Sequence, residues 1–312
     1  MKAVPHQIQS HPRGRFAPSP TGPLHFGSLV SAVGSYLQAK SQGGEWLVRI
    51  EDLDPPREIP GAADQILRTL EAFHLHWDGP VLYQSQRTED YEEALNQLAT
   101  AGHSFPCGCS RKTISGLVSN PDVKTGPLGP IYPGTCRNGL PATMTARATR
   151  LRVAEKPVQF TDLVQGAMSV QLERDIGDFV IKRADGLYAY HLAVVVDDAY
   201  QGVTQIVRGM DLLEATFPHL YLQELLDLAT PQYAHLPIAV NQQGEKLSKQ
   251  THASPISPDQ AGLMLARALS FLGLSPDTGV LYEDPETLLG WAVANWDLSR
   301  VPRVPAILAD SH

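Results

Sequence analysis

The stretch RFAPSPTGPLHFGS at residues 15–28 holds the residue types of a phosphate-binding turn. Pro18, Pro20 and Gly22 break regular structure and predict a loop over residues 17–24, after a short strand at residues 14–16. Ser28 is a candidate cap for a helix, because apolar residues 29, 30, 33 and 37 fall at helical spacing. A helix start attracts anions through its free N–H groups and its dipole. Gly27 would let a nucleotide approach the backbone, and His25 could hydrogen-bond a phosphate or ribose oxygen.

Two lysines three residues apart form a second candidate phosphate site, in Lys246-Leu-Ser-Lys-Gln250. Residues 237–240 read as a strand, which predicts that residues 241–250 form a loop containing Gly244. A lysine on a mobile loop can offset the charge that develops on a departing pyrophosphate. Lysine pairs are common on protein surfaces, so the meaning of this pair depends on the first stretch.

In this order, the two stretches resemble the nucleotide-binding signatures of class I aminoacyl-tRNA synthetases, and the first resembles the glutamyl branch. The resemblance covers about residues 13–255. It implies that ATP binds with Mg²⁺ over the helix start and that a lysine loop closes over the phosphates. The implied ATP-binding residues are His25, Gly27, Ser28, Lys246 and Lys249, of which His25 and Lys249 are the implied catalytic residues. The chain departs from the family pattern at Leu247, where the family has Met, and at Gln250, where it has Ser.

The three cysteines of the chain, Cys107, Cys109 and Cys136, are close in sequence. This spacing is typical of a zinc knuckle with one ligand missing, and the alternative is three free thiols in a loop. His103 and Tyr132 are both candidates for the fourth ligand, and general zinc chemistry favours the imidazole. The pattern CxC…YxxxC resembles that of the glutamyl-Q tRNA(Asp) synthetases, and this resemblance favours Tyr132 over His103. The resemblance implies one structural Zn²⁺ per chain, held by Cys107, Cys109, Tyr132 and Cys136.

Several polar residues at expected strand ends would suit an amino acid with two carboxylates. Arg15 and Arg208 are cations that can grip a carboxylate with two parallel bonds, and Glu51 could accept from an ammonium group. Taken alone, each could equally be an ordinary ion pair. The resemblance implies that L-glutamate binds to Arg15, Ala17, Ser19, Glu51, Tyr190 and Arg208. Asp197 and Asp198 could equally order a turn, and we assign them no catalytic role.

Helix and strand patterns alternate along the chain and predict an α/β fold. With the resemblance, this becomes a class I synthetase Rossmann-like (HUP) parallel sheet with an inserted zinc-containing subdomain and a short helical C-terminal tail. Strands are predicted at residues 46–50, 146–153, 158–163 and 204–207, and a hairpin at residues 179–190. Helices are predicted from about residue 60, at 88–101, at 191–198, after 208, at 261–272 and at 288–296. The predicted division is a flexible tail at 1–12, catalytic halves at 13–102 and 179–255, an acceptor-like zinc subdomain at 103–178 and a helical tail at 256–312.

The composition is that of a soluble globular protein, with 312 residues, 43% hydrophobic and 19% charged. Its 25 basic and 33 acidic residues give a net charge of −8, which argues against a protein that coats nucleic acid nonspecifically. Arg147, Arg150 and Arg152 form a candidate basic cluster, for which solvated charge is the simpler interpretation. Without a long apolar run or a signal-peptide pattern, we expect a cytoplasmic protein with no membrane partner, and a monomer.

The resemblance implies that the chain activates L-glutamate with ATP without needing tRNA, then transfers it to queuosine in the anticodon loop of tRNA(Asp). We expect residues 251–312 to be too few for the anticodon-binding domain of a full glutamyl-tRNA synthetase. One alternative is a truncated or discriminating glutamyl-tRNA synthetase that charges the tRNA 3′ end. Another is a noncatalytic synthetase-like binding protein, against which His25, Lys246 and Lys249 argue.

Overall fold

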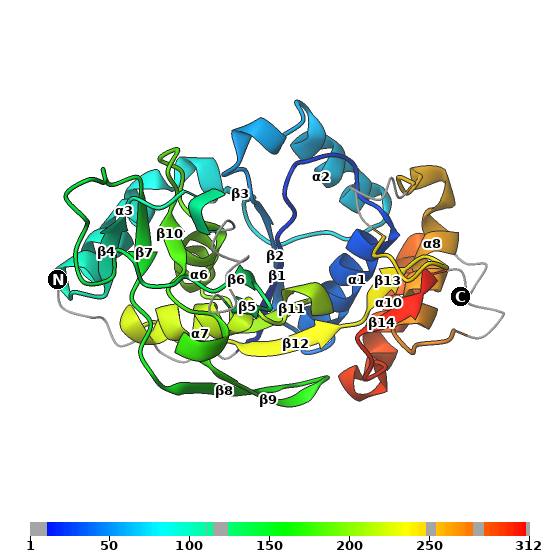
Figure 1. Ribbon diagram of the computed structural model, residues 1–312. Helices are drawn as coiled ribbons and strands as arrows, with labels where there is room; N and C mark the ends of the chain where they lie inside the picture. Colours follow the sequence, from blue (N-terminus) through cyan, green and yellow to red (C-terminus); the bar gives the residue numbers. More distant parts are fainter. Residues whose placement is uncertain (1–10, 111, 115–123, 248–253, 277–283, 310–312) are drawn as a thin grey trace.

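The computed structural model describes residues 11–110, 112–114, 124–247, 254–276 and 284–309. Parallel strands form its centre (Figure 1). Strands β1 (Arg13–Phe16), β2 (Glu45–Ile50) and β3 (Leu82–Tyr83) are paired in that order, and β11 (Gln205–Gly209) pairs with β12 (Gln232–Leu236). The amide of Thr204 donates to the Arg13 carbonyl at 2.9 Å, so β11 lies beside β1. A further parallel pair joins β13 (Ile238–Val240) to β14 (Ala306–Leu308).

Helix α1 (Phe26–Lys40) packs on this layer through an almost fully apolar buried face. Gly34 brings α1 close to β12, since a Cβ there would lie 2.5 Å from Leu236 Cδ1. Helices α2 (Ala62–Ala72), α8 (Ala261–Phe271) and α10 (Pro285–Asn295) contribute to the same core. This packing holds the loop between β1 and α1 in a defined position above the strand ends.

A second core lies on the other side of the strands and is built mainly by α3 (Thr88–Thr100), α6 (Tyr190–Tyr200) and α7 (Thr216–Leu225). Between α3 and α6 the chain forms an antiparallel sheet with the order β10-β7-β4. Its strands are β4 (Ser104–Cys107), β7 (Ala148–Leu151) and β10 (Val180–Lys182). The small hairpin β5 (Thr125–Gly126) and β6 (Gly129–Pro130) lies within this segment, as do the hairpin β8 (Pro157–Asp162) and β9 (Gly166–Gln171) and helix α5 (Leu172–Asp175). Short 3₁₀ turns occur at Pro55–Arg57, Gln84–Gln86, Met210–Leu212, Pro258–Gln260 and Leu298–Arg300.

Two local predictions were wrong. Helix α1 starts at Phe26, so its cap is His25, whose Nδ1 accepts from the Ser28 amide at 3.3 Å, and Ser28 lies in the first turn. The hairpin predicted over residues 179–190 is cut short, because Tyr188 makes only an isolated bridge to Lys182 and Tyr190 already begins α6. Strands β3, β4, β5, β6, β9, β12 and β14 were not predicted, and β14 lies in the tail at 256–312 that was predicted to be helical. None of the described helices combines the length and apolar character that crossing a bilayer requires.

Candidate functional site

A cleft of about 670 Å³ opens where β1, β2 and β11 end. This is the edge at which α/β proteins with parallel strands bind ligands. The predicted ATP and glutamate residues that line it are Arg15, Ala17, Ser19, His25, Gly27, Ser28, Glu51, Tyr190, Arg208 and Lys246. Ser248, Lys249 and Gln250 lie outside the described residues. The fold thus brings together residues that are about 220 positions apart in the chain.

The two phosphate-site stretches touch one another at Gly27. A Cβ at this position would lie 3.3 Å from the His25 ring and 3.3 Å from the Leu247 carbonyl oxygen, so a larger residue would push the two segments apart. Lys246 stands on the wall of the cleft, where its Nζ pairs with Asp211. The start of α1, an imidazole and an ammonium group therefore face one space, which is a suitable arrangement for phosphates.

A buried carboxylate holds two arginines beside the cleft. Asp198 is 2% exposed and accepts from Arg15 Nε at 3.1 Å, from Arg15 Nη2 at 3.4 Å and from Arg49 Nη1 at 2.7 Å. Burial acts to raise the pKa of Asp198, but the two guanidiniums outweigh it and lower the pKa. Asp198 therefore carries a charge that orients Arg15. The neighbouring Asp197 likewise binds three side chains, those of Gln84, Arg87 and Tyr91.

Glu51 follows β2 and pairs with Arg49 at 3.4 Å. Burial raises the pKa of Glu51, although Arg49 and Arg15 act to lower it, so a cation arriving in the cleft would help to keep it ionised. Burial also raises the pKa of Tyr190, which keeps its hydroxyl protonated. An acidic group and a neutral phenol thus line the same cleft as the two predicted arginines.

Arg208 is 4% exposed and is held by neutral partners. Its Nε donates to His235 Nε2 at 3.1 Å, and its Nη2 donates to Thr216 Oγ1 at 2.7 Å and to the Leu212 carbonyl at 3.1 Å. Its Nη1 has longer contacts, 3.4 Å to Tyr190 Oη and 3.5 Å to His219 Nδ1. In both Arg15 and Arg208, Nε and Nη2 already donate to protein groups. The two parallel hydrogen bonds predicted for a substrate carboxylate therefore cannot form along this edge of either guanidinium.

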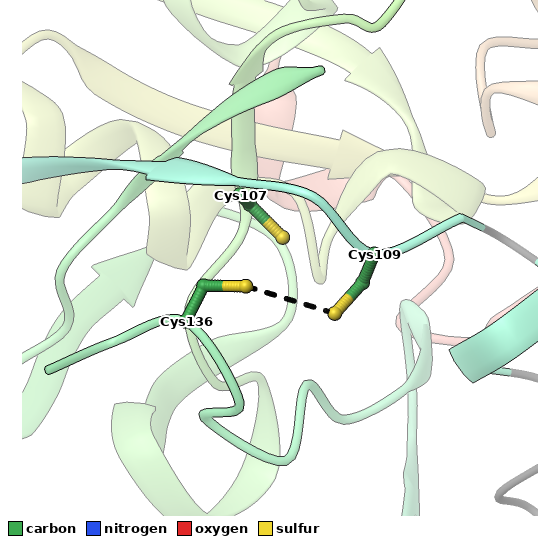
Figure 2. A group of neighbouring side chains, drawn as sticks. All are labelled: Cys107, Cys109 and Cys136. Atoms are coloured by element: carbon green, nitrogen blue, oxygen red, sulfur yellow. Dashed lines mark hydrogen bonds between the residues drawn. The ribbon is translucent and has the colours of Figure 1, made fainter. Parts of the chain in front are cut away.

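The three cysteines lie together beside β4, with their sulfurs within 4.8 Å of one another (Figure 2). Cys109 Sγ is 3.9 Å from Cys136 Sγ, and Tyr132 Oη is 3.5 Å from Cys107 Sγ and 3.7 Å from Cys109 Sγ. A tetrahedral zinc with bonds of ~2.3 Å to sulfur and ~2.0 Å to oxygen would place its ligands ~3.8 Å apart for two sulfurs and ~3.5 Å for sulfur and oxygen. The distances from Tyr132 Oη to Cys107 and Cys109 and from Cys109 to Cys136 therefore suit a tetrahedral zinc, whereas His103 does not lie with the three cysteines in the described residues.

Arg150 supports this group from outside. Its guanidinium lies 4.0 Å from the centre of the Tyr132 ring and its Nε donates to Cys107 Sγ at 3.4 Å. Burial acts to raise the pKa of the Cys107 thiol, but hydrogen bonds from Tyr132 and Arg150 outweigh it and lower the pKa. Arg150 and Arg152, which were predicted as solvated charge, stack instead on Tyr132 and Phe105.

Known proteins match most of the chain. The sequence model of the family described as tRNA synthetases class I (E and Q), catalytic domain, matches residues 12–277. A relative from Dechloromonas aromatica, named glutamyl-Q tRNA(Asp) synthetase, is 55% identical over 95% of this chain and 97% of its own length. A relative of the same name from Chromobacterium violaceum is 56% identical over 94% and 96%.

The chain belongs to the glutamyl-Q tRNA(Asp) synthetase family. It is accordingly a ligase with the class I synthetase catalytic fold. A solved glutamate tRNA ligase from Elizabethkingia meningosepticum shares that fold with a TM-score of 0.78 at 24% identity, and the match covers 95% of this chain and 67% of the other. A structure of the enzyme from Elizabethkingia anophelis matches with the same score.

Five polar residues around the site of this family member were not assigned from the sequence: Arg49, Asp162, Asp197, Asp198 and His235. Arg49 carried a signal, since a charge within the apolar strand Glu45–Ile50 needs a buried partner. Asp197 and Asp198 were noticed, but their partners come from β1, β2 and α3 and are invisible in the linear chain. Asp162 and His235 are 73 positions apart and carried no signal.

Proposed function

We propose that this protein activates L-glutamate with ATP and then transfers the glutamyl group to the queuosine base of tRNA(Asp). The observation that carries the proposal is the cleft in which the α1 start and Lys246 lie beside Arg15, Glu51, Tyr190 and Arg208. The names of relatives that are more than half identical to this chain support the choice of glutamate and of the modified base.

In the first step, ATP lies over the start of α1 with its phosphates toward His25 and the lysine loop. The α-carboxylate oxygen of glutamate attacks the α-phosphorus, the bond from that phosphorus to the bridging oxygen breaks, and pyrophosphate leaves. Lys246, Lys249 and the Mg²⁺ carried by ATP offset the charge on the leaving group. No side-chain nucleophile is required, because positioning and electrostatic stabilisation supply the rate.

The substrate glutamate is placed by groups of opposite charge. Its ammonium group lies toward Glu51, and its carboxylates lie toward Arg15 and Arg208, with Ala17, Ser19 and Tyr190 forming the remaining contacts. Buried cations have this role because a carboxylate arriving in the cleft regains charge-assisted hydrogen bonds that replace its hydration.

In the second step, a hydroxyl oxygen on the cyclopentene ring of queuosine attacks the acyl carbon of the adenylate. The new ester bond forms, the acyl–phosphate bond breaks, AMP departs, and the hydroxyl proton passes to the released phosphate or to solvent. The same cleft chemistry would also serve the 3′ hydroxyl of a tRNA, and the names of the relatives favour the modified base.

We further propose that Cys107, Cys109, Tyr132 and Cys136 hold one zinc ion with a structural role. When bound, the ion would supply crosslinking and no reaction chemistry, because four protein ligands leave no open position. Within this proposal, residues 103–178 form an inserted subdomain between catalytic halves at 13–102 and 179–255. The ion then fixes the segments that follow β4 and β6 against one another.

The test of the first step is glutamate-dependent exchange of pyrophosphate into ATP in the absence of tRNA. Exchange is expected with glutamate and not with glutamine, and an inactive wild-type protein would overturn the proposal in favour of a noncatalytic binding protein. For the second step, labelled glutamate should transfer to queuosine-containing tRNA(Asp). Preferential transfer to tRNA(Glu) would instead identify a glutamyl-tRNA synthetase.

A further inference from the structure

Behind the cleft, a buried chain of hydrogen bonds ends on Arg208. His235 lies on β12 and is 0% exposed, and Asp162 at the end of β8 is 2% exposed. His235 Nδ1 lies 2.6 Å from Asp162 Oδ2, and His235 Nε2 lies 3.1 Å from Arg208 Nε. Neither Asp162 nor His235 lines the cleft, so each would act on a bound substrate through Arg208.

The tautomer of His235 follows from its partners: Asp162 at Nδ1, and Arg208 Nε together with the Thr216 hydroxyl, 3.2 Å away, at Nε2. An arginine Nε carries a hydrogen at any physiological pH, so His235 Nε2 must accept. The imidazole proton therefore sits on Nδ1 and is donated to Asp162. Burial lowers the pKa of His235, although Asp162 acts to raise it, which agrees with a neutral ring.

Asp162 is itself fixed by backbone groups. Its Oδ1 accepts from the amides of Val164 at 3.0 Å, Gln165 at 2.9 Å and His235 at 3.1 Å, which leaves Oδ2 for the imidazole. A carboxylate is required here because one oxygen meets three N–H donors and the other meets a fourth. An amide could present an acceptor to only one of the two sides.

Arg208 is anchored on one edge and left open on the other. The partners of Nε and Nη2 are His235, Thr216 and the Leu212 carbonyl, at 2.7–3.1 Å, whereas the contacts of Nη1 are 3.4 and 3.5 Å. Among the described residues, the hydrogen-bond partners of Arg208 are all neutral groups. Arg15 differs, since Asp198 already pairs with it.

We propose that Asp162 and His235 are positioning residues that lock the Nε–Nη2 edge of Arg208, so that Nη1 alone receives a carboxylate of the amino-acid substrate. This inference rests on the proposed function, because it assumes that glutamate binds beside Arg208. In this arrangement Asp162, at the β8–β9 turn, sets the tautomer of His235 on β12. His235 in turn sets the direction of the Arg208 guanidinium at the cleft.

The variant Asp162→Asn tests the tautomer directly. If the amide keeps its oxygen toward the three backbone donors, its NH₂ group faces His235, which must then accept at Nδ1 and carry its proton on Nε2. That proton would oppose Arg208 Nε–H and displace the guanidinium. In glutamate-dependent pyrophosphate exchange, we expect KM for glutamate to rise roughly 10- to 100-fold, with KM for ATP changing less than about 2-fold.

Two further variants keep the proposal falsifiable if Asp162→Asn folds poorly. Thr216→Val preserves shape but removes the hydroxyl that accepts from Arg208 Nη2 and lies 3.2 Å from His235 Nε2. It should raise KM for glutamate, whereas Thr216→Ser, which keeps the hydroxyl, should leave KM near the wild-type value. Tyr233→Phe is the matched control, because its buried hydroxyl lies on the same strand and bonds Gln223, not Arg208. We expect this variant to leave both KM values within about 2-fold of wild type.

The ¹⁵N signals of His235 give a readout that a merely structural role would not move. The wild type should show a protonated Nδ1 and a bare Nε2, and Asp162→Asn should show the reverse. If the wild type shows exchange and the folded variants Asp162→Asn and Thr216→Val keep the wild-type KM for glutamate, the positioning role of Asp162 and His235 is overturned. The proposed function would remain intact. An equal rise in both KM values, or a wild-type His235 protonated on Nε2, would also overturn the positioning role. Absence of exchange in the wild type would instead reject the proposed function.

Discussion

The clearest test of how the cleft is held together is removal of the charge of Asp198. Asp198→Asn keeps the shape of the side chain but leaves Arg15 and Arg49, which are 4% and 0% exposed, without their shared carboxylate. Arg49 would keep one ionic partner, Glu51, at 3.4 Å. Arg15 would have none among the described residues.

The expected loss follows from burial. Breaking a buried ion pair by neutralising one partner costs about 3–5 kcal/mol, because the other charge stays buried without compensation. Two features place this variant near the lower end: Glu51 remains beside Arg49, and the asparagine oxygen can still accept one hydrogen bond. We therefore expect a loss of about 3 kcal/mol, a large part of the 5–15 kcal/mol that is typical of folded proteins.

Urea denaturation monitored by tryptophan fluorescence measures the effect. The matched control is Glu224→Gln, which neutralises the exposed pair between Lys156 and Glu224, whose side chains are 35% and 60% exposed. That variant should lose about 0–1 kcal/mol. A loss below about 1 kcal/mol in Asp198→Asn, with an unchanged denaturant slope, would refute the reasoning that this carboxylate compensates two buried charges.

Three further predictions concern stability and the metal. Burial lowers the pKa of His191 to about 4 and holds the pKa of His219 well below its usual value, so both stay neutral when folded and take up protons on unfolding. Because the unfolded state takes up these protons below pH ~6.5, the free energy of unfolding falls as the pH drops from ~6.5 toward 4. For His191 the loss is on the order of 2 kcal/mol between pH 6.5 and 5. A melting temperature independent of pH over this range would contradict this prediction. Tyr132→Phe should lower zinc content measured by mass spectrometry, whereas His103→Ala should not, and the reverse result would restore the imidazole as the fourth ligand. Gly34→Ala should destabilise the protein by about 0–2 kcal/mol in thermal melts, because displacing the Leu236 side chain 2.5 Å from the new Cβ costs about 1–3 kcal/mol and removing a glycine from the helix interior returns about 1 kcal/mol; a more stable variant would contradict this.

Much of the local structure could be predicted from the sequence where one segment carries its own signal. The β1–α1 loop follows from its prolines and Gly22, and β2, α3, β11 and α8 follow from apolar periodicity bounded by breakers. The cap of α1 was misassigned because Ser28 has the usual cap chemistry, whereas the helix starts early enough for His25 to reach the Ser28 amide. Strand β12 was missed because Gln232 and His235 interrupt its apolar run, and the polar partner that explains His235 comes from β8.

For the candidate site, the residues that line the cleft could be predicted and the residues that orient them could not. Motif spacing and resemblance identify Arg15, Glu51 and Arg208, which the structure gathers in one cleft. The orientation of each arginine depends on a buried acid or imidazole brought from a distant strand or helix. Such a partner has no local signature, since an aspartate that ends a helix or a strand looks the same whether it caps a turn or holds a guanidinium.

The proposed reaction places the glutamyl group on a modified base and not on the 3′ end of a tRNA. The most direct measurement uses tRNA(Asp) from which the 3′-terminal adenosine has been removed, with and without queuosine, incubated with the protein, ATP and labelled glutamate. We expect the trimmed tRNA to be labelled as well as the intact one, and only when it contains queuosine. Loss of labelling on trimming, or equal labelling without queuosine, would contradict it.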